Sequence, residues 1–169
     1  NVETAVKIAV FSDIHLGHKN TKTKDIIENL RELIFKDHSN KELNILFLAG
    51  DVFDGLLDLN DEDLPFIDFF IEDLLRFCNK YEISLRILEG TPSHDWTQSQ
   101  RFLTIAKMLD LPNLDILYID NIHIEHNERF NMNILYVPDE IQPTVDKTLK
   151  IVKDLLIAKG LDSVDKIGR

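Results

Sequence analysis

The chain has 169 residues, of which 30 are acidic and 19 are basic, and its formal net charge is -11 at pH 7. This length suffices for one domain with a substantial core, and the negative charge argues against broad electrostatic attraction to nucleic acid, although a bound divalent metal can overcome the average field locally. The single cysteine, Cys78, excludes an internal disulfide and indicates a reducing, cytoplasmic location, and the lack of an apolar run of about 18 residues argues against a membrane span.

Short apolar runs alternate with helix-length segments in the first half of the chain. Runs at Val6–Ser12, Asn44–Ala49 and Ile83–Glu89 have the length and composition of buried strands. The segments 24–37 and 61–81 carry apolar residues at helical spacing and connect these strands. The alternation predicts an α/β fold with crossover helices packed on a sheet.

The second half of the chain has a different pattern. A helix is predicted at 97–109, followed in close succession by short strands at 115–119, 122–126 and 132–137. A last helix is predicted at 145–158. The close spacing of the strands favours antiparallel additions to the sheet or a small second layer. No repeat or linker divides the chain, so one layered α/β domain is expected.

Acidic or histidine side chains follow each of the first three predicted strands. They are Asp13, His15, Asp51, Asp54, His94 and Asp95. In an open α/β sheet the carboxyl ends of the strands carry the chemistry, so these groups are expected side by side along one edge. Carboxylates gathered in this way repel one another and favour a bound cation.

The spacing of these residues fits a centre with two divalent metals. Asp13 and His15 are two residues apart, so both side chains point the same way on extended backbone. Asp51 follows the second strand, and a carboxylate there could bridge two cations. Such a centre activates water for phosphoryl displacement. Carboxylate and imidazole ligands favour Mn or Fe, with Mg or Zn as alternatives.

The third strand is followed by His94 and Asp95, an imidazole beside a carboxylate. Such a pair can protonate a departing alkoxide near neutral pH, and a simple polar turn is the alternative. Trp96 could stack on a base, but an aromatic residue that anchors the turn in the core is the preferred interpretation. Cys78 is expected to pack in the core.

These three strand ends together resemble a known family. Asp13–His15, Gly50–Asp54 and Gly90–Asp95 are similar to the first three motifs of the calcineurin-like metallophosphoesterases, D-x-H, G-D-x-x-D and G-N-H-D/E. The longer forms D-I-H-L-G and G-D-V-F-D look most like the SbcD-type DNA repair and recombination nucleases, including phage versions. The resemblance covers about residues 6–95 and extends more loosely to 133–138.

The resemblance implies a metallophosphoesterase-like sheet core flanked by helices, with residues 1–169 forming a single nuclease domain that is incomplete at its C-terminal end. It implies that Asp13 and His15 bind the first metal and that Asp51 bridges the two metals. Asp54 would not bind a metal itself but would help to orient these ligands.

The family likeness also implies roles for His94 and Asp95. His94 would act on the leaving group or the scissile phosphate, and Asp95 would orient His94. The implied activities are manganese-dependent 3′ to 5′ exonuclease and endonuclease activity on DNA. A homodimer formed through helices after the second and third motifs, and an SbcC-like ATPase partner, are implied as well.

Two departures from the family pattern are visible. The motif G-N-H is replaced by Gly90–His94, so the metal-binding asparagine is absent and Ser93 is only a weak candidate ligand. The later H and G-H-x-H motifs are also missing. His123 and His126 are poor replacements, because their order relative to residues 136–138 differs from the order in the family. A metallophosphatase for small molecules or proteins, and a degenerate non-catalytic nuclease-fold subunit, therefore remain alternatives.

Overall fold

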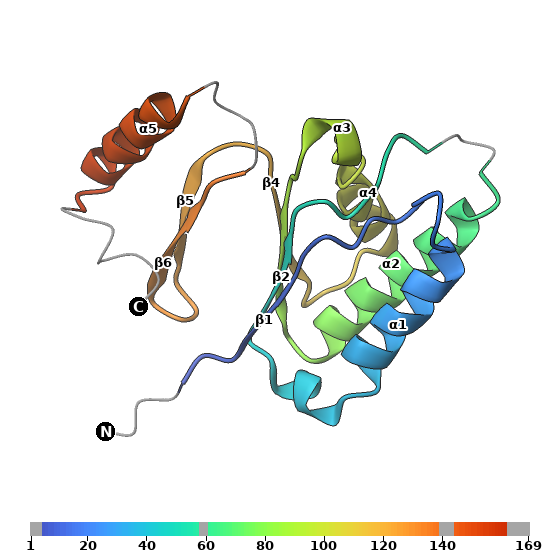
Figure 1. Cartoon of the computed structure of the whole chain (residues 1–169). Coiled ribbons are helices and arrows are strands. Elements are labelled where there is room, and N and C mark those ends of the chain that lie inside the picture. Colours follow the sequence, from blue (N-terminus) through green and yellow to red (C-terminus); the bar gives the residue numbers. More distant parts are fainter. Residues whose placement is uncertain (1–4, 58–60, 139–143, 162–169) are drawn as a thin grey trace. The chain divides into compact units, whose positions relative to one another are not determined.

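The computed structural model describes residues 5–57, 61–138 and 144–161, with the side chain of Ser93 left undescribed. The chain forms two compact units, which meet in sequence between Tyr118 and Ile119. Figure 1 shows the elements of both units. Each unit is described by itself below.

The first unit is built on a parallel four-stranded sheet with the strand order β1-β2-β3-β4. Its strands are β1 (Ile8–Phe11), β2 (Ile45–Ala49), β3 (Ser84–Leu88) and β4 (Asp115–Ile119). Ile8 pairs with Ile45, and Ile45 in turn pairs with Ser84, so the first three strands run in step. The predicted α/β class and the first three strands are therefore confirmed.

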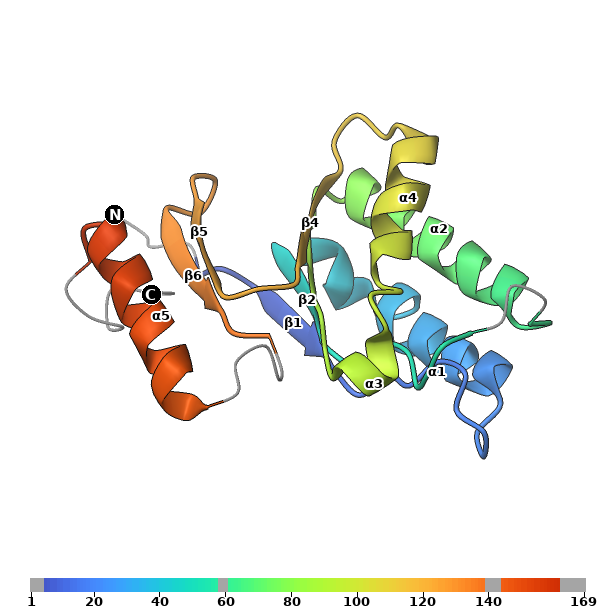
Figure 2. The same ribbon diagram turned by 90° about the horizontal axis from the view of Figure 1, so that it is seen from above.

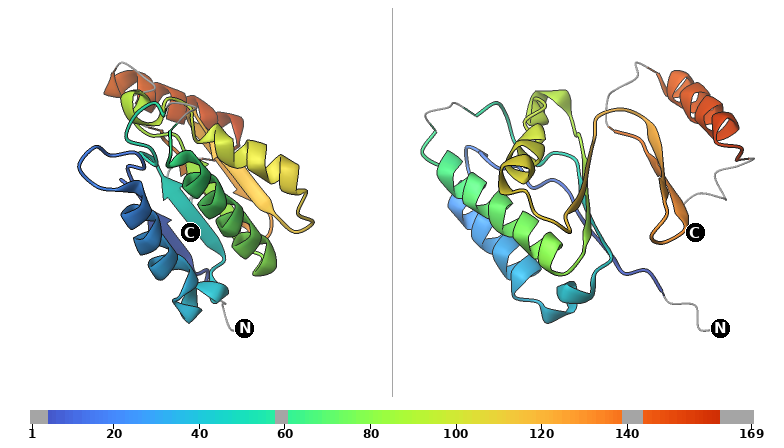
Figure 3. Two further views of the ribbon diagram at one scale, coloured as in Figure 1. Left: turned by 90° about the vertical axis from the view of Figure 1, so that its right-hand side faces the viewer. Right: turned by 180° about the vertical axis from the view of Figure 1, so that it is seen from behind.

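Helices connect the strands, and the long helices cover one face of the sheet. They are α1 (Thr23–Phe35), the 3-10 helix η1 (His38–Glu42), α2 (Leu64–Lys80), α3 (Pro92–Asp95) and α4 (Gln100–Leu109). The long helices α1, α2 and α4 lie on the same face of the sheet (Figures 1 and 2), and α2 lies between α1 and α4 (Figure 3). The three helices and the sheet enclose the main core.

The core explains the periodicity of the sequence. Most residues of β2 and β3, such as Leu46 and Leu85, are buried, and so are Ile71 and Leu74 of α2. Cys78 also lies in this core, as expected, and burial raises the pKa of its thiol to about 12. Burial of these apolar side chains fixes which face of each element turns inward.

Two elements differ from the prediction. β4 joins the parallel sheet and is not an antiparallel addition to it. There, beside β3, the Asp115 carboxylate accepts hydrogen bonds from Ser84 Oγ at 2.7 Å and from Arg86 Nη2 at 2.9 Å. The helix predicted at 97–109 begins only at Gln100, because Trp96 and the residue after it have positive φ angles that no α-helix accommodates.

The second unit contains an antiparallel hairpin and one helix. β5 (His123–Asn127) pairs with β6 (Met132–Tyr136), and α5 spans Val145–Ala158. Ile124 of the hairpin and Leu156 of the helix belong to one apolar cluster. The hairpin and the bounds of the last helix are as predicted. Within the described part of the chain, every helix is too short or too polar to cross a bilayer.

Candidate metal centre

The loops that follow β1 and β2 remain paired beyond the ends of the strands. His15 N–H donates to the carbonyl of Asp51 at 3.0 Å, and Leu16 N–H donates to that of Val52 at 2.8 Å. Leu16 and Phe53 then form a parallel bridge and are almost fully buried. This buried bridge holds the polar residues of the two loops at the same level above the sheet.

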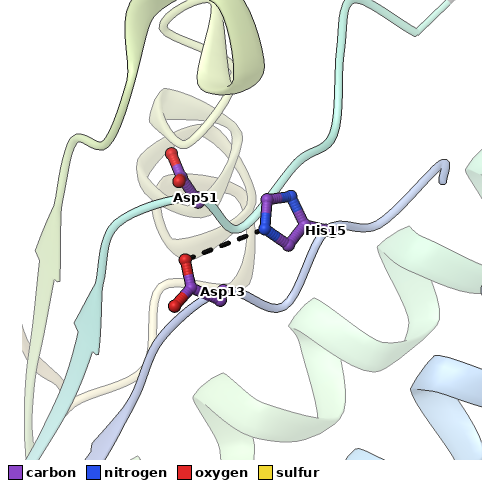
Figure 4. Close-up of side chains that lie close together, drawn as sticks. All are labelled: Asp13, His15 and Asp51. Atoms are coloured by element: carbon purple, nitrogen blue, oxygen red, sulfur yellow. Dashed lines mark ion pairs between the residues drawn. The ribbon is translucent and has the colours of Figure 1, made fainter.

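Asp13, His15 and Asp51 are brought together by this pairing. Each offers one ligand atom, and these atoms lie within 4.8 Å of one another. Figure 4 shows the Asp13 and His15 side chains facing each other, with Asp51 beside them on the neighbouring loop. Asp13 Oδ1 lies 3.7 Å from His15 Nε2. The predicted convergence of these three residues is therefore present.

The backbone at this edge is strained. Asp13, His15 and Asp51 have φ angles of 52°, 54° and 51°, in the left-handed region that non-glycine residues rarely adopt. Each such residue costs free energy and persists only where the surrounding structure enforces it. Strain at all three candidate ligands indicates that the fold gives up stability to place them.

The opposite side of the His15 ring faces Asp54. Its Nδ1 atom lies 3.2 Å from Asp54 Oδ1, but the alignment is too poor for a hydrogen bond. Asp54 thus lies behind the imidazole, where a carboxylate commonly orients a metal-binding histidine. Its supporting role stays a prediction.

His94 joins the group from the loop after β3. Its Nδ1 atom lies 3.4 Å from Asp51 Oδ2, and its ring centroid lies 5.1 Å from that of His15. Nδ1 is buried and makes no hydrogen bond to any described residue. Because Nδ1 faces the Asp51 carboxylate, the remaining ring nitrogen, Nε2, is the atom of His94 that a ligand could contact.

The residues present fit a divalent metal ion. Partial burial opposes the charge on Asp51, but the hydrogen bond from Thr91 N–H and the imidazole of His94 close by outweigh it, so the pKa of the Asp51 carboxyl lies below its usual range. An anionic carboxylate, a second carboxylate from Asp13 and the imidazole of His15 form the mixed oxygen and nitrogen set that Mn, Fe or Zn accepts. Asp13, His15 and Asp51 are the residues that would hold the ion.

Thr91 contributes to the site, although no role was predicted for it. Its N–H donates to Asp51 Oδ1 at 2.8 Å, and its hydroxyl lies 3.4 Å from Asp51 Oδ2. The signal in the sequence was its position directly after Gly90, at the end of the third apolar run. Ser93 lies in α3, but its side chain is outside the described residues, so its weak candidacy as a ligand stays untested.

Asp95 is fully buried, and its contacts differ from the predicted role of orienting His94. Its carboxylate accepts hydrogen bonds from the backbone N–H groups of Asp51, Phe53 and Gly90 at 3.1, 3.0 and 2.7 Å. Burial raises the pKa of Asp95, and these hydrogen bonds only partly offset the effect. Asp95 therefore contacts the loops that carry the site rather than the imidazole.

Two further sequence interpretations can be checked against the structure. Trp96 is 52% exposed, so it does not anchor the turn in the core. His123 stacks on Tyr136, and His126 Nδ1 lies 2.9 Å from Asn133 Oδ1, so both histidines make contacts within the hairpin of the second unit.

Comparison with known proteins identifies no family. No protein-family model matches the chain, and no curated protein matches it significantly. The structure shows an α/β protein with a parallel four-stranded sheet, an antiparallel hairpin and a possible metal-binding group of Asp13, His15 and Asp51.

Proposed function

We propose that this chain is a metal-dependent phosphodiesterase that hydrolyses DNA, as an SbcD-like nuclease subunit in double-strand break repair or recombination. The observation that carries the proposal is the convergence of Asp13, His15 and Asp51 within 4.8 Å, with His94 3.4 Å from Asp51. Hydrolysis of a phosphodiester needs both a cation site and a nearby proton donor. Three consecutive strand ends supply both kinds of group.

The residues have different roles in the proposed reaction. When bound, a divalent metal ion activates water and offsets the charge of the phosphoryl oxygens. Asp13, His15 and Asp51 hold the ion, and Asp54 steadies the His15 ring. Manganese is the preferred metal, with Mg, Fe or Zn as alternatives.

His94 acts on the leaving group in this proposal. Water loses a proton to solvent as its oxygen forms a bond to phosphorus. The bond from phosphorus to the departing sugar oxygen breaks, and that oxygen takes a proton from His94. Because Nδ1 of His94 faces Asp51, its Nε2 is the atom left to give this proton. Partial exposure of the ring, 38% of the side chain, allows a substrate to reach it.

DNA as the substrate is supported by the resemblance and by exposed Trp96, two residues beyond His94. The net charge of -11 opposes nonspecific binding to DNA. Binding would therefore depend on the metal and on contacts made at the site. The 3′ to 5′ exonuclease and endonuclease activities, a homodimer and an SbcC-like ATPase partner belong to the same proposal.

The proposal is tested by incubating the purified protein with linear DNA, with and without Mn²⁺. We expect Mn-dependent degradation, which His94→Ala lowers by about 10²- to 10⁴-fold. His38→Ala is the matched control, because His38 begins η1, ahead of β2 rather than after it, and contacts Lys41. The control should degrade DNA at the wild-type rate.

The alternatives give different results in the same assay. Hydrolysis of a chromogenic phosphodiester without degradation of DNA would favour a phosphatase or phosphodiesterase for small or protein substrates. Binding of Mn²⁺ by the folded protein without hydrolysis of either substrate would favour a non-catalytic nuclease-fold subunit. Either result would contradict the proposed DNA hydrolysis.

A further inference from the structure

Asp95 is the most deeply buried acid near the candidate metal centre, with no exposed surface. A carboxylate removed from water is costly unless its oxygens receive hydrogen bonds. Oδ2 of Asp95 accepts from the N–H groups of Asp51 and Gly90, and Oδ1 accepts from Phe53 N–H. One side chain therefore connects the loop after β2 with the loop after β3.

The connection is reciprocal. Asp95, from the β3 loop, accepts from the backbone of the β2 loop, while Asp51, from the β2 loop, accepts from Thr91 N–H in the β3 loop. This bond occupies Oδ1 of Asp51, and Oδ2 is the oxygen that faces His94. The two carboxylates thus fix the orientation of the Asp51 side chain.

The approach of the two loops depends on glycine. A Cβ atom on Gly90 would lie 2.2 Å from Asp51 N and 2.9 Å from Asp95 Oδ2. Any larger residue at this position would push the loops apart. The hydrogen bond from Asp51 N–H to Asp95 also helps offset the strain of the positive φ at Asp51.

We propose that Asp95 is a positioning residue that presets the Asp51 carboxylate for metal binding by locking the β2 and β3 loops together before the ion arrives. A ligand held in place by such a supporting shell pays less ordering entropy on binding. The inference rests on the metal site of the proposed function, and it requires no particular substrate. It also replaces the sequence-based role of Asp95 as a partner of His94.

Amide hydrogen exchange of the metal-free protein tests the lock directly. We expect the amides of Asp51, Phe53 and Gly90 to exchange slowly in the wild type. Asp95→Asn retains one acceptor oxygen and turns an NH₂ group toward backbone N–H donors, so these amides should exchange at least about tenfold faster. Unprotected exchange of all three in the wild-type protein would overturn the proposal, whether or not the variant folds.

Manganese affinity, measured by electron paramagnetic resonance of free Mn²⁺, separates positioning from general support of the fold. Asp95→Asn should weaken binding by about 10- to 100-fold, the effect of losing a group that orients a ligand. The matched control is Glu89→Gln, a buried acid that accepts from Thr97 N–H and Tyr118 Oη. It should lower stability while its manganese affinity stays within about twofold.

Each outcome is informative. Equal affinity of wild type and Asp95→Asn, or equal losses in Asp95→Asn and Glu89→Gln, would overturn the proposal. Failure of the wild type to bind Mn²⁺ would overturn it together with the proposed function. Manganese binding that depends on Asp95, in a protein that leaves DNA intact, would support the lock and contradict the nuclease.

Discussion

The polar groups at the two ends of the parallel sheet differ in their hydrogen bonding. At the amino end, Lys7 N–H donates to Asn44 Oδ1, Ser84 N–H donates to the Asn44 carbonyl, and buried Arg86 pairs with Asp115. At the carboxyl end, buried Nδ1 atoms of two histidines make no hydrogen bond to any described residue.

The difference distinguishes a structural end of the sheet from a functional one. Paired groups at the amino end contribute to stability, because each buried donor has an acceptor. Strained backbone at the carboxyl end costs stability, which is expected where residues are placed for a ligand and not for the fold. Substitutions at the two ends should therefore affect different properties.

The largest effect is expected at the carboxyl end, from Asp51→Asn. Removing the carboxylate that lies beside the other two candidate ligands should lower Mn-dependent DNA hydrolysis by more than about 100-fold. The melting temperature of the metal-free protein should fall modestly, because the lowered pKa of Asp51 means that its charge contributes to stability, while the amide retains an acceptor for Thr91 N–H. Rates and thermal melts of the same preparation measure both.

Asp25→Asn is the matched control for this substitution, since Asp25 is exposed in the first turn of α1. The variant should keep the wild-type rate of hydrolysis. A similar loss of rate in both variants would remove the distinction between the carboxyl end and the rest of the surface.

The next effect is expected at the amino end, from Arg86→Ala. Arg86 is 3% exposed and donates to the Asp115 carboxylate, so its removal should cost about 2 kcal/mol of unfolding free energy. The value lies below that of a fully buried pair because Asp115 can return to water. Urea denaturation measures the loss, and the manganese affinity of the folded variant should be unchanged.

An exposed ion pair provides the comparison for Arg86. Arg76 pairs with Glu72 on the surface of α2, so Arg76→Ala should change the unfolding free energy by less than about 0.5 kcal/mol. Equal losses of unfolding free energy in Arg86→Ala and Arg76→Ala would mean that burial of the ion pair adds nothing to its contribution to stability. A lower manganese affinity in Arg86→Ala would show that the two ends are coupled.

A smaller effect is expected for Trp96, the only tryptophan of the chain. In the His94→Ala variant with Mn²⁺ present, its fluorescence should be quenched by single-stranded DNA, and adding Trp96→Ala should weaken DNA binding about fivefold. Phe69→Ala is a suitable control, since Phe69 is 61% exposed on α2. Unchanged fluorescence on DNA binding would exclude contact between Trp96 and the bases.

The smallest change is expected for Cys78 in the core. Because burial raises the pKa of this thiol to about 12, it stays protonated and unreactive at pH 8 in the folded protein. A thiol-specific reagent should label it only after denaturation. Rapid labelling of the native protein would contradict the packing of α2 against the sheet.

The sequence sufficed for the first three strands and for the residues at their ends. Apolar runs of strand length end shortly before Asp13, Asp51 and the turn that carries His94, and parallel strands place such ends at one edge. The bounds of α5 were also predicted correctly from helical periodicity. These features depend on local patterns, which a single sequence displays.

Features that depend on contacts between distant segments were missed. The hydrogen bonds of Asp95 and Thr91 go to the backbone of other loops or to a side chain 40 positions away, and no residue pattern encodes them. The late start of α4 follows from left-handed backbone at Trp96 and Thr97, a conformation that neither residue type favours. The exposure of Trp96 was likewise set by this turn and not by its hydrophobicity.

Binding of Mn²⁺ to the wild-type protein tests the central claim most directly, that the carboxyl end of the sheet is a metal site. We expect electron paramagnetic resonance to show saturable binding, and we expect a hundredfold excess of Mn²⁺ over its dissociation constant to raise the unfolding free energy by about 2.7 kcal/mol. Asp51→Asn should abolish both effects. A folded wild-type protein that neither binds Mn²⁺ nor gains stability from it would contradict the account.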